Sequence, residues 1–112
     1  MLSSYPKVYQ LGHAAIPELF FDPVLVQEKI DGSQISFGFV DGRLQIKSHH
    51  CEVDQDNPGM FEEGVKEIQD LQEDLVEGWI YRGEYLRTPR HNTLSYSRIP
   101  KHHIILFDIS VL

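Results

Sequence analysis

Residues 33–48 read SQISFGFVDGRLQIKS, and apolar side chains alternate with polar ones on both sides of a central Asp41-Gly42 pair. Alternation with a period of two is typical of a strand with one buried face, and an Asp-Gly pair is typical of a two-residue hairpin turn. The face predicted to be buried carries Ile35, Phe37, Phe39, Leu44 and Ile46. This stretch therefore predicts an antiparallel β-hairpin whose apolar face belongs to the core.

A further strand is predicted on the N-terminal side of this hairpin. Residues 24–30 are rich in β-branched side chains and end at Asp31-Gly32, a second turn pair of the same kind. Residues 5–21 give mixed signals and are expected to be mostly loop. Residues 24–48 as a whole thus predict a three-stranded antiparallel meander.

An amphipathic helix is predicted for residues 57–77. Asn57 followed by Pro58 is typical of an N-cap and a first helical position, and Gly78 is a typical stop. Apolar side chains recur at helical spacing at Phe61, Val65, Ile68, Leu71 or Gln72, and Leu75. The opposite face is acidic, so the helix is expected to lie on the surface with its apolar face on the sheet.

Two more strands are predicted at residues 79–86 and 104–109, with a polar loop at residues 88–100 between them. The last strand is expected to be buried, because it opens with four consecutive apolar residues. The order of elements, β-β-β-α-β-loop-β, predicts an α+β fold in which one helix packs on an antiparallel sheet.

The composition is that of one small domain or part of a larger one. A chain of 112 residues can bury a modest core, and none of its apolar runs approaches the roughly 20 residues that a membrane helix needs. Residues 1–10 show no signal-peptide pattern. The single cysteine, Cys51, cannot form an internal disulfide. A reducing, cytoplasmic setting without a membrane is therefore expected.

Charge is unevenly spread along the chain. The net charge of −7 taken alone argues against a partner that is a nucleic acid. Residues 52–77, however, hold ten acidic residues, whereas Glu84 is the only acid in residues 82–103. The second segment is basic and carries Arg82, Arg87, Arg90, Arg98 and Lys101. The mean charge therefore conceals a surface that is predicted to face phosphate.

The stretch Glu28-Lys29-Ile30-Asp31-Gly32 bears most directly on function. It places a lysine at the end of the first predicted strand, just before a tight turn. The pattern by itself favours a structural interpretation, because Asp-Gly pairs form hairpins and lysines often flank them.

The same stretch resembles motif I, Lys-x-Asp-Gly, of the covalent nucleotidyltransferases, which comprise DNA ligases, RNA ligases and capping enzymes. Three later segments resemble further motifs in the family's order: Lys47-Ser48-His49 for motif Ia, Arg82-Gly83-Glu84-Tyr85 for motif III, and Leu106-Phe107-Asp108-Ile109 for motif IIIa. Across residues 24–109 the chain is similar to the RNA ligase branch related to RNA ligase 2. The resemblance implies the front half of an adenylation domain with an ATP-grasp-like ligase fold.

The resemblance also implies the chemistry of an ATP-dependent RNA ligase. In that family a lysine, here Lys29, attacks the α-phosphate of ATP, expels pyrophosphate and holds AMP through a phosphoramide. AMP then passes to a 5′-phosphate RNA end, which a 3′-hydroxyl attacks to seal the strand. ATP and Mg²⁺ are the expected cofactors, and RNA ends are the expected partners. DNA ligase and capping activities stay open, because the sequence does not fix the acceptor.

Individual site residues follow from the resemblance. The implied nucleotide-binding set is Glu28, Lys29, Ile30, Asp31, Gly32, His49, Glu84 and Phe107. Glu84 matches the glutamate that contacts the ribose or helps to bind metal, and its alternative is an ordinary exposed strand residue. Phe107 matches the aromatic ring that stacks on adenine, and its alternative is core packing. The implied RNA-binding set, with a solvated loop as its alternative, is Arg87, Arg90, Arg98 and Lys101.

The turn pair of motif I leaves two interpretations open for each residue. Asp31 could orient Lys29 or a metal, or it could only shape the turn. Gly32 could let the backbone approach phosphate closely, or it could supply a positive φ.

The chain departs from the family pattern in two places. His49 stands where a basic residue is usual, and no segment matches motifs IV and V. Residues 1–112 are therefore expected to be a partial adenylation domain, as a truncated chain, a fragment of a longer product or a degenerate relative. An inactive remnant that binds nucleotide or RNA, and an accessory structural protein, remain alternatives. An incomplete sheet would expose a strand, so self-association is expected.

Zinc and cysteine chemistry are weaker candidates. The pairs His49-His50 and His102-His103 would point to opposite faces of a strand, and no partner at metal-ligand spacing follows them. Cys51 has no recognisable base beside it in the sequence. Neither feature predicts a site.

Overall fold

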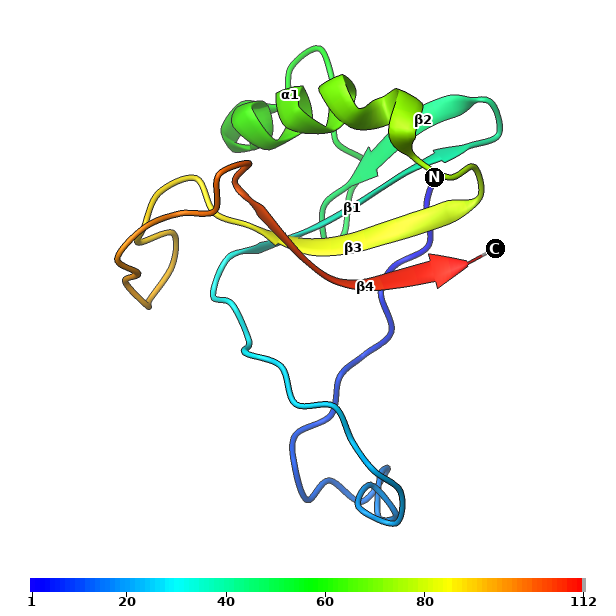
Figure 1. Cartoon of the computed structure of the whole chain (residues 1–112), viewed down its shortest axis with the longest axis vertical. Helices are drawn as coiled ribbons and strands as arrows, with labels where there is room; N and C mark the ends of the chain where they lie inside the picture. Colours follow the sequence, from blue (N-terminus) through cyan, green and yellow to red (C-terminus); the bar gives the residue numbers. More distant parts are fainter. Residues whose placement is uncertain (112) are drawn as a thin grey trace.

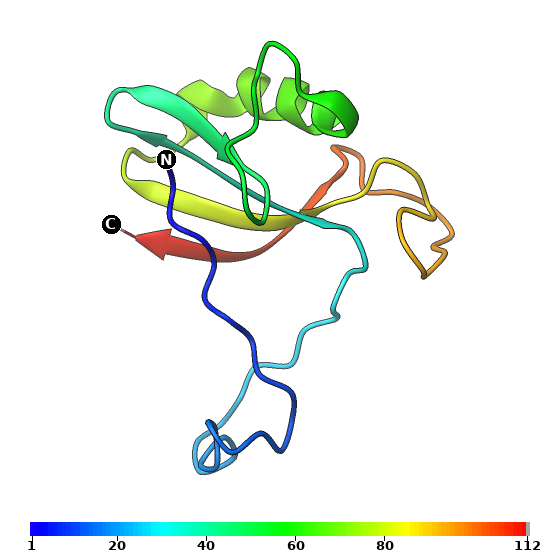
Figure 2. The ribbon, with the colours of Figure 1, turned by 180° about the vertical axis from the view of Figure 1, so that it is seen from behind.

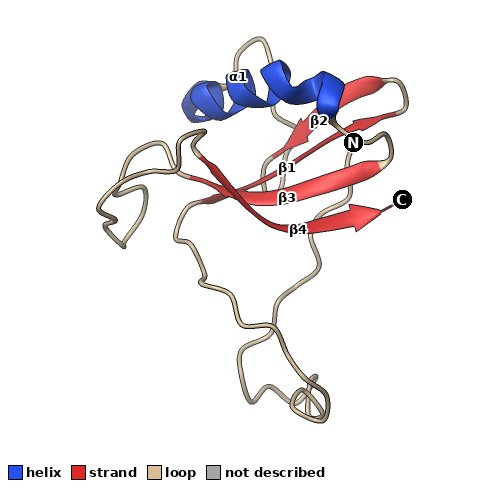
Figure 3. Ribbon diagram, in the orientation of Figure 1, coloured by secondary structure: helices blue, strands red, loops and turns tan. Residues whose placement is uncertain are grey.

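The computed structural model describes residues 1–111, which form a four-stranded antiparallel sheet with one helix on one face (Figure 1 and Figure 3). The α+β class predicted from the sequence is confirmed. The elements run in the order β1 (Ser33–Val40), β2 (Arg43–Lys47), η1 (Gly59–Phe61), α1 (Glu62–Leu71), η2 (Gln72–Asp74), β3 (Trp79–Tyr85) and β4 (Ile104–Val111). The spatial order of the strands is β2-β1-β3-β4.

The hairpin of β1 and β2 forms as predicted. Asp41 and Gly42 have φ values of 55° and 76°, and two positive φ values in succession are what a type I′ hairpin turn requires. The two strands pair in antiparallel register, with Phe37 opposite Ile46 and Phe39 opposite Leu44. Their apolar side chains consequently point to the same side of the sheet.

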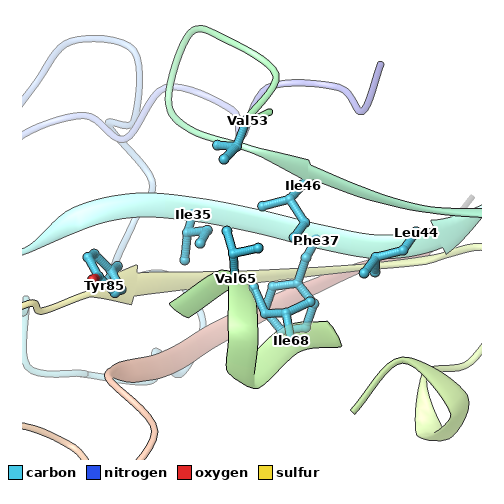
Figure 4. Packing of buried hydrophobic residues seen from close by; sticks show 8 residues of the cluster. All are labelled: Ile35, Phe37, Leu44, Ile46, Val53, Val65, Ile68 and Tyr85. Carbon is cyan, nitrogen blue, oxygen red and sulfur yellow. The ribbon is translucent and has the colours of Figure 1, made fainter. Parts of the chain in front are cut away.

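That side of the sheet is covered by α1, and the main core lies between them (Figure 4). The buried cluster comprises Ile35, Phe37, Leu44, Ile46, Val53, Val65, Ile68 and Tyr85. The Tyr85 ring lies against Gly64 of the helix, where a Cβ would come within 2.8 Å of the ring. Its hydroxyl oxygen lies 2.6 Å from the Met60 carbonyl oxygen and 2.8 Å from a Glu63 carboxylate oxygen, and its single hydrogen is shared between these two acceptors. The phenol thus joins β3 to the first turns of the helical region.

The predicted helix is present, but its α-helical part is shorter than residues 57–77. Single 3₁₀ turns, η1 and η2, flank α1 at either end. The predicted cap at Asn57 is wrong, because Pro58 takes the cap position of η1 and no side chain caps either segment there. Gly59 has a φ of 61°, and a residue with positive φ cannot continue an α-helix toward the N-terminus.

The strand predicted at residues 24–30 is absent. This segment runs below the sheet as part of a long excursion that begins after the first few residues (Figure 1). β1 already has β2 on one edge and β3 on the other, so no edge is free to take a third partner. Leu25 and Val26 are accordingly 85% and 86% exposed. The β-branched composition of this segment predicted a strand, but composition cannot show whether another strand has a free edge with which to pair.

The last strand forms where predicted, but the expectation that it is buried is wrong. β4 lies at the edge of the sheet with β3 as its neighbour, and α1 covers the strands farther in. Leu106 and Ile109 are 49% and 42% exposed. A run of consecutive apolar residues identified the strand, but it could not show which strands would flank it.

We expect this exposed edge to make the chain self-associate, because β4 presents unpaired backbone groups beside apolar side chains. Ile109→Lys should lower the apparent mass at high protein concentration, since it places a charge on that strand. Light scattering after size-exclusion chromatography, over a range of loading concentrations, measures the effect. Leu11→Lys is the matched control, because Leu11 is 74% exposed and belongs to the long excursion that precedes β1 rather than to the sheet. An unmodified chain that stays monomeric at every concentration would refute this expectation.

None of the helices in residues 1–111 is long and apolar enough to cross a bilayer.

Candidate functional site

Lys29 and Glu84 border the same open cavity, which has a volume of about 350 Å³. Its lining is Lys29, Ile30, Asp31, Gly32, Glu84, Thr93 and Leu94. The two stretches meet because Gln34 of β1 pairs directly with Glu84 of β3, so the residues that precede β1 lie beside the end of β3. The sheet thus brings together the segments that resemble motifs I and III.

Glu84 is a half-buried carboxylate on the face of the sheet opposite α1. Burial raises the pKa of Glu84, the negative charge of Asp31 raises it as well, and the positive charge of Lys29 opposes the shift. The interpretation of Glu84 as an ordinary exposed strand residue therefore does not hold. The positive charge of the Lys29 side chain thus acts on the Glu84 carboxylate.

Asp31 fastens the loop after β3 to the start of β1. Its Oδ2 atom accepts the backbone N–H groups of Thr93 at 2.8 Å and Leu94 at 2.7 Å. The N–H of Asp31 donates to the Tyr96 hydroxyl at 2.8 Å. The hydrogen bonds from Leu94 and then Thr93 lower the pKa of Asp31. The predicted hairpin turn at Asp31 is wrong, and its carboxylate shapes the loop after β3 instead.

The docked loop should loosen in acid, and we expect Asp31 to be the cause. A carboxyl group whose pKa is lowered in the folded state contributes stability above its ordinary pKa of about 3.9, and loses it as the pH falls through the lowered value. NMR titration of the Thr93 and Leu94 amides, from pH 6 downward, should show them leaving their docked environment in that acidic range. Asp31→Asn should remove this transition, whereas Asp41→Asn, at the tip of the hairpin, should leave it intact. Identical titrations in the parent and Asp31→Asn would contradict the assignment.

Gly32 is required by a close approach of two backbone segments. A Cβ at this position would lie 2.4 Å from the carbonyl oxygen of Tyr85, a distance that real Cβ atoms do not reach. Its φ lies outside the left-handed region, so the interpretation that Gly32 supplies a positive φ is wrong. The close approach of the Tyr85 carbonyl is a requirement for glycine that the sequence did not indicate.

Phe107 lies outside both buried hydrophobic clusters, so the core-packing interpretation does not describe it. The pairing of β3 with β4 shifts register between Arg82 and Gly83, which leaves Phe107 without a partner on β3. Its ring meets that of Tyr5 edge to face, with 5.1 Å between centroids. Its carbonyl accepts a long hydrogen bond of 3.5 Å from the Gln27 side chain. Phe107 thus flanks the face that bears Glu84 but does not line the cavity.

His49 is joined to the same face through Gln34. The His49 Nδ1 atom lies 2.8 Å from Gln34 Oε1, and Gln34 is the residue that pairs with Glu84. The ring also packs against His50, with 4.0 Å between centroids. Glu28, in contrast, is exposed and does not border the cavity.

Arg82 is a buried residue whose role the sequence did not show. The N-terminal segment crosses the face opposite α1 (Figure 2), and the Arg82 guanidinium beneath it donates to the Ser3 carbonyl at 2.7 Å and to Ser36 Oγ at 3.0 Å. It lies 5.8 Å from the Tyr5 ring centroid. Burial lowers the pKa of Arg82. The expectation that Arg82 belongs to an exposed basic surface is therefore wrong, although alternation along β3 does place it on the same face as Glu84.

The four predicted RNA-binding residues are exposed and lie on the loop after β3, which projects beyond the end of the sheet (Figure 1). Arg87 borders a second cavity near the Lys29 cavity. Arg90, Arg98 and Lys101 border neither of the two cavities. The loop is thus basic throughout, but only its first arginine is part of a concave surface.

Comparison of the chain with protein-family models, curated proteins and solved structures gives no match. The functional argument therefore rests on the residues and their arrangement.

Proposed function

We propose that this chain carries the nucleotidyl-transfer site of an ATP-dependent RNA ligase, with Lys29 as the residue that takes up AMP. The observation that carries the proposal is the cavity shared by Lys29, Asp31 and Glu84. It combines an amine that can act as a nucleophile with two carboxylates that can bind the metal ion of a nucleotide, and that ion neutralises the nucleotide's charge. The motif-like order of these residues in the sequence supports the same function.

The proposed step is attack of the Lys29 Nζ on the α-phosphorus of ATP. An N–P bond forms, and the bond from the α-phosphorus to the oxygen that bridges to the β-phosphate breaks. That oxygen keeps the electron pair and leaves as part of pyrophosphate, while the attacking nitrogen loses its proton to water. Lysine can reach the neutral amine form that this attack requires, whereas arginine stays protonated.

The carboxylates beside Lys29 fit a magnesium ion. Mg²⁺ is usually held by one or two protein carboxylates, with substrate phosphates and waters as its other ligands. Glu84, with Asp31 near it, would supply the protein ligand, and no group of three or more His, Cys, Asp or Glu side chains arranged for a metal occurs in residues 1–111. When bound, Mg²⁺ supplies charge neutralisation of the triphosphate. A cation here would also reduce the electrostatic repulsion between the Glu84 and Asp31 carboxylates.

Asp31 is the residue that holds this site in place. Its two hydrogen bonds to the loop, together with the close approach of Gly32 to β3, fix the backbone two and three residues after Lys29. Sites attached to strands are positioned more accurately than sites on free loops. The Lys29 side chain itself is exposed, so ATP can approach it from solvent.

The proposal is tested by incubating the purified chain with ATP and Mg²⁺ and recording an intact mass spectrum. We expect the mass to increase by one AMP and to return to its starting value when pyrophosphate is added. Transfer of the AMP to a 5′-phosphorylated RNA, with DNA of the same sequence alongside, identifies the acceptor. A mass that stays unchanged with ATP would overturn nucleotidyl transfer by this chain.

A second candidate function is binding of nucleotide without transfer. It is favoured because no segment of residues 1–112 matches motifs IV and V, which the resemblance assigns to metal binding and to the lysines that hold the α-phosphate. Calorimetric titration with ATP separates the two functions. Heat of binding without any adduct would select the second.

A further inference from the structure

Tyr96, in the loop after β3, makes a hydrogen bond to the backbone of the segment that carries Lys29. The backbone N–H of Asp31 donates to the Tyr96 hydroxyl at 2.8 Å. Asp31 borders the Lys29 cavity, whereas Tyr96 is not part of the cavity lining. Tyr96 also belongs to none of the segments that resemble the ligase motifs. The bond to Asp31 therefore gives this tyrosine a connection to the site that motif order did not indicate.

This hydrogen bond is the backbone anchor nearest to Lys29. Within residues 1–111, no backbone group of residues 22–30 makes a hydrogen bond, and the pairing of β1 with β3 begins only at Ser33. Other bonds from the loop hold the Asp31 side chain and the Gly32 carbonyl. The bond to Tyr96 instead fixes the peptide plane between Ile30 and Asp31. A single residue, Ile30, thus separates Lys29 from the first fixed peptide.

Tyr96 is held in place by contacts that do not involve its hydroxyl. Its backbone N–H donates to the Pro89 carbonyl at 2.8 Å, which closes the loop on itself. Thr93 and Leu94, which bind the Asp31 carboxylate, fix the chain three and two residues earlier. Tyr96 is half-buried, although the residues on either side of it are exposed. Removal of the hydroxyl alone should therefore break one hydrogen bond and leave the loop docked.

The backbone beside Lys29 matters because the lysine side chain is long, flexible and exposed. Attack on phosphorus requires the Nζ atom to lie about 3–3.5 Å from the phosphorus, in line with the leaving oxygen. A backbone that also moves would spread the amine over many more positions. A peptide plane fixed one residue away reduces this spread, and it does so without any contact between Tyr96 and the nucleotide.

We infer that Tyr96 is a positioning residue, whose hydroxyl fixes the backbone beside Lys29 and thereby raises the rate of attack on ATP. The effect on rate rests on the proposed function, whereas the effect on backbone order does not. A group that acts only on the geometry of the attacking amine changes the rate at saturating ATP and leaves ATP binding unchanged.

The first test measures backbone order by NMR, without ATP. In the parent chain, the Asp31 amide should exchange with deuterium more slowly than the amides of Lys29 and Ile30. In Tyr96→Phe, ¹⁵N relaxation should give lower order parameters for Lys29 and Ile30, below about 0.6, a value typical of flexible backbone. The Thr93 amide should keep its chemical shift in the variant, because the loop stays docked on Asp31.

The second test follows AMP uptake by intact mass against time, over a range of ATP concentrations with Mg²⁺. Tyr96→Phe should lower the rate at saturating ATP by about tenfold, as misplacement of a reacting group does, and should change the half-saturating ATP concentration by less than about twofold. Tyr9→Phe is the matched control, because it removes a phenol hydroxyl from an exposed tyrosine outside the cavity. It should change neither quantity.

Order parameters of Lys29 and Ile30 that are the same in Tyr96→Phe and in the parent would overturn the inference. An Asp31 amide that exchanges as fast as its neighbours in the parent would overturn the anchor itself, even if the variant folded poorly. A rise in the half-saturating ATP concentration that matches the loss of rate would assign Tyr96 to nucleotide binding instead. A parent chain without any AMP adduct would count against the proposed transfer function, and the NMR data alone would then support or overturn the anchor.

Discussion

Replacing Lys29 by alanine is expected to abolish the AMP adduct completely and to leave the fold unchanged. No other residue that borders the cavity carries an amine, so nothing can take over the nucleophilic role. The Lys29 side chain is exposed and belongs to neither hydrophobic cluster, and its loss should therefore cost little stability. Lys29→Arg should be equally inactive, because a guanidinium stays protonated at neutral pH.

Intact mass after incubation with ATP and Mg²⁺ measures the adduct, and far-ultraviolet circular dichroism with a thermal melt measures the fold. Lys101→Ala is the matched control, since it removes an exposed lysine outside the cavity and should retain the full adduct. Peptide mapping of the adduct in the parent chain should locate AMP on Lys29. An adduct that persists in Lys29→Ala would reject the assignment of the nucleophile.

Gly32→Ala is expected to destabilise the chain by about 1–3 kcal/mol, the usual range for forcing an extra carbon into a filled space. The added Cβ would lie 2.4 Å from the Tyr85 carbonyl oxygen, and backbone atoms cannot swing aside as a flexible side chain can. The start of β1 must move away from β3, and Lys29 moves with it. Loss of adduct should therefore exceed the loss that the unfolded fraction alone explains.

Gly38→Ala is the matched control for this effect. Its Cβ would also lie 2.4 Å from a carbonyl oxygen, that of Trp79, at the other end of the sheet. Both variants should unfold at lower urea concentrations, which a denaturant titration measures. Only Gly32→Ala should form less adduct per folded molecule. Equal adduct formation in the two folded variants would show that the close packing of Gly32 against the Tyr85 carbonyl does not position Lys29.

Most of the regular structure could be predicted, because local patterns determine it. The hairpin followed from alternation around Asp41-Gly42 and α1 from its helical periodicity, and β3 formed within the strand predicted at residues 79–86. The strand predicted at residues 24–30 failed because composition cannot say whether a sheet has a free edge. The exposure of β4 escaped prediction for the related reason that burial depends on neighbours elsewhere in the chain.

The candidate site could be predicted as a set of residues but only partly as an arrangement. Motif order predicted that Lys29 and Glu84 lie close together, and the pairing of β1 with β3 places both residues at one cavity. The hydrogen bonds between Asp31 and the loop after β3, and the burial of Arg82, depend on contacts between segments that are distant in the sequence. No local pattern encodes such contacts. The chemical roles of these residues stay predictions.

Trp79 is the only tryptophan of the chain and lies at the opposite end of β3 from Glu84. Five residues of extended strand separate the two by roughly 17 Å. Its partly buried indole, 6.3 Å from the Tyr81 ring between centroids, would report unfolding through its emission but would be too distant to sense a nucleotide at Lys29. Unchanged intrinsic fluorescence on adding ATP would thus say nothing about binding. A tryptophan at Leu94, which borders the cavity and is 52% exposed, in a chain with Trp79→Phe would give the optical signal that the natural fluorophore cannot.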